Sequence, residues 1–142
     1  MANPDALECA LRALRHRDRS IYELGQRLER RGFSESERGH AIETLIRTEL
    51  LDDRRLAQAR ATSLAGRGAG DALIRHTLGQ ARVAPELVED ALQALPPEAE
   101  RAGVIVSRRG GGPRTARYLT GKGFSEEVVA GVVAGGTDDE LG

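Results

Sequence analysis

The chain has 142 residues, of which 30% are charged, and its 21 basic and 22 acidic side chains leave a formal net charge of −1. This balance argues against a protein that binds any polyanion through charge alone. No apolar run reaches the roughly 18 residues of a membrane-spanning helix, and the first residues lack the basic and apolar segments of an export signal. The single cysteine, Cys9, has no internal disulfide partner. These features predict a cytoplasmic protein.

One short stretch occurs twice, as Gly32-Phe33-Ser34-Glu35 and as Gly123-Phe124-Ser125-Glu126. In each copy, apolar residues at helical spacing precede and follow it. Glycine just past a helix end adopts a positive φ without a Cβ penalty, and serine caps the next helix. The stretch therefore predicts a duplicated helix-turn-helix corner. A third corner is expected at Arg82-Val83-Ala84, where arginine occupies the position of the glycine.

In chain order, apolar spacing predicts nine helices, and no stretch alternates long enough to indicate a strand. Leu7, Leu11 and Leu14 mark the first helix, and glycine-rich stretches at 66–70 and 110–112 and the pair Pro96-Pro97 separate later ones. Capping residues or a helix-starting proline mark most of the starts: Ser20, Ser34, Asp52-Asp53, Asp71, Pro85 and Ser125.

The nine helices form three groups of three, which we predict to be repeats over 1–53, 54–96 and 97–135, followed by an acidic, disordered tail over 136–142. The predicted fold is all-α: three tandem three-helix repeats stacked into an elongated, curved, solenoid-like rod. Each triplet is close to the lower size limit for independent folding, so we expect neighbouring triplets to share apolar surface.

The residue pattern does not favour catalysis. His16, His40 and His76 fall in different helical regions, and no two have the i, i+4 spacing of a helical metal site. Asp52-Asp53 is explained by helix capping more simply than by metal binding. We expect no catalytic, cofactor or metal site.

Basic side chains recur on the second helix of each predicted triplet. If these helices are aligned, their cations form one stripe that can meet an acidic protein or phosphate. The alternative is an ordinary solvated face, supported by the i, i+4 pair Glu23–Arg27. The candidate partner-binding residues are Arg27, Arg31, Arg75, Arg114, Arg117 and Lys122.

Several motifs, in order and spacing, resemble the RecX family over roughly residues 7–134. They are Ser20-x-x-Glu23-Leu24, Leu28-x-x-x-Gly32-Phe33, Leu50-Leu51-Asp52-Asp53-Arg54-Arg55-Leu56-Ala57, Arg67-Gly68-x-Gly70 and Tyr118-Leu119-x-x-Lys122-Gly123-Phe124-Ser125. The resemblance implies a non-catalytic regulator of bacterial RecA recombinase. Such a regulator would bind RecA filaments on DNA, inhibit ATP hydrolysis, strand exchange and coprotease activity, and so modulate repair, recombination and the SOS response.

Two other functions remain open. Helix-turn-helix pairs with arginine-rich second helices can enter DNA grooves, although the near-neutral charge and only four aromatic residues argue against a dedicated nucleic-acid-binding module. A helical-repeat adaptor for another protein is the second alternative. Weak DNA contact is compatible with every interpretation, and we expect a monomer.

Overall fold

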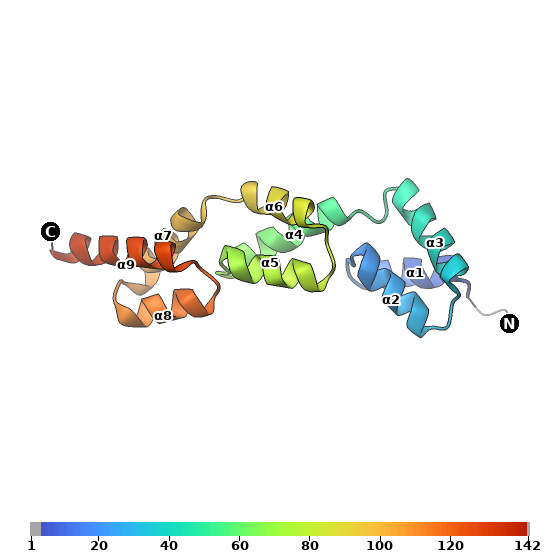
Figure 1. Cartoon of the computed structure of the whole chain (residues 1–142), viewed down its shortest axis with the longest axis horizontal. Coiled ribbons are helices and arrows are strands. Elements are labelled where there is room, and N and C mark those ends of the chain that lie inside the picture. Colours follow the sequence, from blue (N-terminus) through green and yellow to red (C-terminus); the bar gives the residue numbers. More distant parts are fainter. Residues whose placement is uncertain (1–3, 142) are drawn as a thin grey trace.

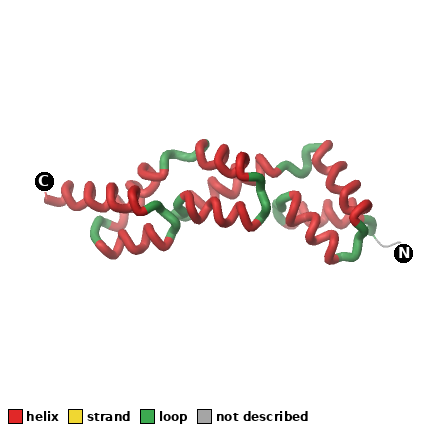
Figure 2. Tube along the Cα trace, viewed as in Figure 1, coloured by secondary structure: helices red, strands yellow, loops and turns green. Residues whose placement is uncertain are grey.

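The structure is a computed structural model that describes the backbone of residues 4–141 and the side chains of residues 4–134. Within that range it contains nine α-helices and no strand, which confirms the all-α prediction (Figures 1 and 2). The helices are α1 (Ala6–His16), α2 (Ile21–Arg30), α3 (Glu35–Arg47), α4 (Asp53–Gly66), α5 (Asp71–Gln80), α6 (Pro85–Gln93), α7 (Glu98–Arg109), α8 (Pro113–Gly121) and α9 (Glu126–Leu141).

The helices are arranged as three triplets in an elongated row. α1–α3, α4–α6 and α7–α9 each pack chiefly among themselves. The ends of the chain lie at opposite ends of the row (Figure 1). The tandem order predicted from the repeated corners is therefore the order in space.

Each triplet has a hydrophobic cluster of its own. Leu24, Leu28 and Leu45 belong to the first cluster, Ile74 to the second, and Leu119 to the third. The buried cores of the three triplets are therefore separate, so the apolar surface expected between neighbouring triplets does not extend to a shared core. The helices of each triplet pack on one another, and side-chain and backbone hydrogen bonds join one triplet to the next.

The corner chemistry follows the sequence prediction. Gly32 and Gly123 have φ values of +90° and +92°. Ser20 and Ser34 both complete a capping box, with Glu23 and Glu37 respectively. These side-chain bonds satisfy backbone N–H groups that the first turn of a helix leaves unpaired.

At the middle corner, Arg82 itself adopts the left-handed conformation, with φ +58°. This conformation costs a non-glycine residue about 1–2 kcal/mol. The Arg82 guanidinium lies 5.4 Å from the centroid of the Tyr22 ring in the first triplet. A cation–π contact of this kind offsets part of the backbone cost.

Two local predictions differ from the structure. Asp71 does not cap α5: the cap is Gly70, which has no side chain, and the first N–H groups of α5 are bonded by the third triplet instead. The segment 136–142 was predicted to be disordered, whereas the α9 backbone continues to Leu141; residue 142 lies outside the described residues. Gly135 and Gly136 lower helix propensity by about 1 kcal/mol each but do not oblige a helix to end.

Candidate interaction surfaces

The first junction joins triplet 1 to triplet 2 through the start of α2. The Ser20 hydroxyl donates a hydrogen bond to the Ala81 carbonyl at 2.7 Å and accepts one from the Glu23 N–H at 3.1 Å. Asp53, the first residue of α4, accepts the Ile21 N–H at 2.9 Å. Ser20 is completely buried, so this hydroxyl connects two triplets and caps a helix at the same point.

An ion pair accompanies these bonds. The Arg60 guanidinium lies 2.8 Å from one Glu23 carboxylate oxygen and 3.3 Å from the other. Burial acts to raise the pKa of Glu23, but hydrogen bonds from Arg60 and from the Ser20 N–H outweigh it and hold that pKa below its ordinary value. Burial raises the pKa of Asp53 despite the Ile21 N–H. As the pH falls, the stabilising contribution of Glu23 is therefore lost, whereas protonation of Asp53 favours the folded state.

The second junction joins triplet 2 to triplet 3 through backbone. The Gly70 N–H donates to the Lys122 carbonyl at 2.8 Å, and the Ala72 N–H donates to the Gly123 carbonyl at 3.1 Å. A Cβ on Gly70 would lie 2.5 Å from the carbonyl carbon of Gly123, and a Cβ on Gly123 would lie 2.6 Å from the Leu73 nitrogen. Only glycine permits this approach of the two backbones.

As Asp53 does at the first junction, the first residue of the following triplet contributes a carboxylate to the second junction. Glu98 opens α7 and accepts the Asp71 N–H at 2.7 Å and the Ser125 N–H at 3.0 Å. Arg101 donates to the Ala69 carbonyl at 2.9 Å and pairs with Asp71. Asp53 and Glu98 thus have the same role, which is to bind the first N–H of the second helix in the preceding triplet.

Both junctions align the second helices. The start of α2 meets the corner after α5, and the start of α5 meets the corner after α8, so α8, α5 and α2 follow one another along one edge of the row (Figure 1). This is the alignment that a stripe of cations on second helices requires.

The six predicted partner-binding residues lie along that edge in different environments. Arg75 forms a two-pronged pair with Glu89, at 2.7 and 3.2 Å, so its charge is balanced. Lys122 is half-buried, and its carbonyl belongs to the second junction. Within the described part of the chain, the structure shows no ion pair for the remaining four: Arg27, Arg31, Arg114 and Arg117.

Arg27 lines a hollow of about 500 Å³ in triplet 1, here called the first arginine hollow. Arg17, Arg19 and Arg30 line it as well, together with the half-exposed ring of Tyr22. Burial, and then the positive charges of Arg27 and Arg17, lower the pKa of Arg19. A group of cations that repel one another is a favourable place for an anion.

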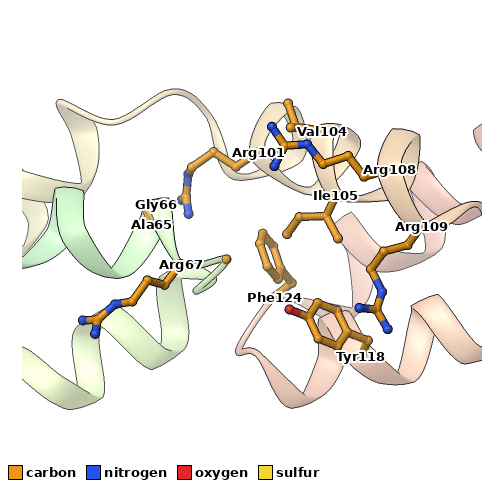
Figure 3. Close-up of a pocket in the computed structure, with 11 residues that line it drawn as sticks. Ala65, Gly66, Arg67, Arg101, Val104, Ile105, Arg108, Arg109, Tyr118 and Phe124 are labelled. Carbon is orange, nitrogen blue, oxygen red and sulfur yellow. The ribbon is translucent and has the colours of Figure 1, made fainter.

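A second arginine hollow, of about 430 Å³, lies where the end of α4 faces α7 and α8 (Figure 3). Its basic residues are Arg67, Arg101, Arg108 and Arg109. Sequence reasoning did not select them, because it followed the second helix of each triplet, whereas three of them belong to α7. The adjacent pair Arg108-Arg109 at the end of that helix was the available signal.

Metal-ligating side chains do not cluster within the described residues. No group of three histidine, cysteine, aspartate or glutamate side chains there is placed to hold a metal ion. Nor does that part of the chain contain a helix with the length and apolar character to cross a membrane. The arrangement defines an elongated helical-repeat protein with cationic hollows along its length.

Comparisons with known proteins identify the family. The model of the first three-helix domain of RecX matches residues 6–45, and that of the second matches residues 52–92. The regulatory protein RecX of Halorhodospira halophila is 32% identical over 95% of this chain and 91% of its own length. RecX of Vibrio parahaemolyticus is 35% identical over 63% of this chain, an alignment that spans 57% of that protein.

The fold has solved counterparts. The crystal structure of RecX from Lactobacillus salivarius superposes with a TM-score of 0.78 over 91% of this chain and 92% of the other, at 19% identity. A crystal structure of another regulatory protein RecX gives 0.74 over 89% of this chain and 69% of the other, at 23% identity. The chain belongs to the RecX family of regulatory proteins.

Proposed function

We propose that this chain is a non-catalytic, cofactor-free cytoplasmic regulator that binds the RecA recombinase filament on DNA. It would inhibit the ATPase, strand-exchange and coprotease activities of the filament and so modulate repair and recombination. Membership of the RecX family supports RecA as the partner. The observation that carries the proposal is the end-to-end alignment of α8, α5 and α2, because it spreads cationic groups along one rod and suits a long, repetitive partner better than a small substrate.

The ends of the row support action as a monomer. Both junctions use a carboxylate on the first residue of the next triplet, but α1 begins with Ala6. The start of α8 is Pro113, which has no N–H to offer to a further corner. A second copy would therefore lack the groups that join one triplet to the next.

The test is RecA-catalysed ATP hydrolysis and strand exchange on single-stranded DNA, measured with increasing amounts of the protein. We expect both rates to fall. Unchanged rates at several-fold molar excess would refute the proposal.

The cation stripe can be tested in the same assay. The double variant Arg27→Ser/Arg31→Ser removes two cations without carboxylate partners and should weaken inhibition about tenfold, as lost charge-assisted contacts do. Arg114→Ser/Arg117→Ser tests the other end of the row. Arg75→Ser is the matched control, because that charge is already balanced by Glu89. A loss of binding free energy in the control about half that of each double variant would show that net charge alone matters, because the control removes one charge and each double variant removes two.

Direct nucleic-acid binding is the second candidate, and the first arginine hollow favours it. Its four arginines line the same hollow as Tyr22, whose ring is 40% exposed, with the Arg82 guanidinium 5.4 Å from the ring centroid. Fluorescence anisotropy with labelled single-stranded DNA, repeated at several salt concentrations, distinguishes the two functions. Tight binding without recombinase and with a steep salt dependence would favour this candidate. An adaptor for another protein would leave both the recombinase and the DNA assays unaffected.

A further inference from the structure

The second arginine hollow is built by two triplets. Ala65, Gly66 and Gly68 come from the end of α4 and the turn that follows it, whereas Ile105 of α7 and the corner residue Phe124 come from triplet 3. In Figure 3, Ile105, Phe124 and Tyr118 lie together at the centre, with Arg101, Arg108 and Arg109 about them, whereas Arg67 extends from the opposite wall and away from this group. The hollow therefore depends on the second junction, which holds its two walls together.

The charges around this hollow are not balanced. Arg101 is engaged with Asp71 and the Ala69 carbonyl. Arg67, Arg108 and Arg109 are exposed, and the described residues provide no carboxylate partner for any of them. No acidic side chain of the described chain lines the hollow. Guanidinium groups bind carboxylates with two parallel hydrogen bonds, so this rim is complementary to an acidic ligand.

The apolar residues of the hollow indicate which kind of apolar group the acidic ligand contains. Val104 is 49% exposed beside the hollow, whereas Phe124 is only 5% exposed. The Tyr118 ring is covered by the Arg109 guanidinium, 3.7 Å from its centroid. A nucleobase needs a free aromatic face on which to stack, whereas Phe124 is buried and Arg109 already occupies one face of Tyr118. An aliphatic side chain needs only apolar contact, which Val104 and Ile105 supply.

We propose that the second arginine hollow binds an acidic peptide segment of a partner protein. An aliphatic side chain of the segment packs on Val104 and Ile105, and neighbouring carboxylates pair with Arg108 and Arg67. The site itself is inferred from its own geometry. Only the assignment of the segment to a recombinase filament rests on the proposed function.

The test uses the full chain and a fluorescein-labelled peptide in which aspartate and glutamate flank leucine, followed by fluorescence anisotropy at low salt. We expect saturable binding that Arg67→Ala/Arg108→Ala weakens about tenfold or more, since two charge-assisted contacts are lost. Val104→Ser should weaken it less. A peptide with asparagine and glutamine in place of the acids should not bind, and one with serine in place of leucine should bind more weakly.

Arg12→Ala/Arg47→Ala, two exposed arginines of triplet 1 that line neither arginine hollow, is the matched control and should leave peptide affinity unchanged; circular dichroism checks that each variant is helical. Equal affinity of the parent and the Arg67/Arg108 variant, or no peptide binding at all, would overturn this proposal. Either result would overturn the peptide proposal even if the protein still inhibits the recombinase, so the experiments distinguish failure of this proposal from failure of the proposed function. If oligothymidylate binds instead, with the same sensitivity to Arg67→Ala/Arg108→Ala, the hollow is a nucleic-acid site and the peptide assignment is wrong.

Discussion

The two junctions solve the same geometric problem with different chemistry. At the first, side chains span the gap, with the Ser20 hydroxyl on the Ala81 carbonyl. At the second, two glycines let the backbones touch, with the Gly70 N–H on the Lys122 carbonyl. At both junctions, a carboxylate of the following triplet accepts the first N–H of the second helix in the preceding triplet.

This difference shows how repeats can diverge while the row is preserved. At the first junction the corner residue, Arg82, carries a side chain, and the two triplets are joined there through the Ser20 hydroxyl and not by direct backbone contact. Where the backbones close in, as between Gly70 and Gly123, no side chain fits on either partner. The first junction should therefore tolerate substitutions at its corner that the second does not.

The largest expected effect is at the second junction. Gly123→Ala would place a Cβ 2.6 Å from the Leu73 nitrogen at φ +92°, and we expect the free energy of unfolding in urea to fall by about 3 kcal/mol. Gly32→Ala is the control, because its φ is +90° and the added Cβ meets open space. It should cost about 1–2 kcal/mol. Equal losses would mean that the close backbone contact adds nothing.

The next effect is at the first junction. Ser20→Ala removes a helix cap and leaves the Ala81 carbonyl without its donor, so we expect a loss of about 2 kcal/mol. Ser34→Ala removes an equivalent capping box that makes no contact with another triplet and should cost about 1 kcal/mol. Urea unfolding of both variants gives the difference. A Ser20 variant no weaker than the Ser34 variant would show that the inter-triplet bond is not stabilising.

A smaller effect, of opposite sign, is expected at the middle corner. Arg82→Gly relieves a left-handed arginine but gives up the contact with Tyr22, and the net gain should be about 0.5–1 kcal/mol. Thermal unfolding followed by circular dichroism measures it. A lower melting temperature would show that the contact with Tyr22 outweighs the backbone strain.

The smallest effect is the dependence on pH at the first junction. Because the pKa of Glu23 is held below its ordinary value of 4.5, its stabilising contribution is complete above that pH and is lost as pH falls through the lowered pKa. The raised pKa of Asp53 acts in the opposite sense, since protonation favours its folded form. Glu23→Gln should flatten the acid side of the stability profile; a profile as steep as that of the parent would contradict the assignment.

The local elements were readable from the sequence. The capping boxes at Ser20 and Ser34 and the glycine corners at Gly32 and Gly123 are decided by contacts within a few residues, so spacing alone identified them. The tandem arrangement followed from repetition of those corners. The cap expected at Asp71 failed because its position depends on Glu98, which is remote in the chain.

Tertiary structure alone decided how the triplets join and where the cations gather. Nothing local indicates that a serine on α2 bonds a carbonyl after α5, or that Arg75 is balanced by Glu89. The second arginine hollow needs walls from two triplets, so no periodicity within one helix reveals it. Helix starts and stops are short-range properties of the backbone, whereas junctions and hollows depend on distances between groups that only the folded row brings together.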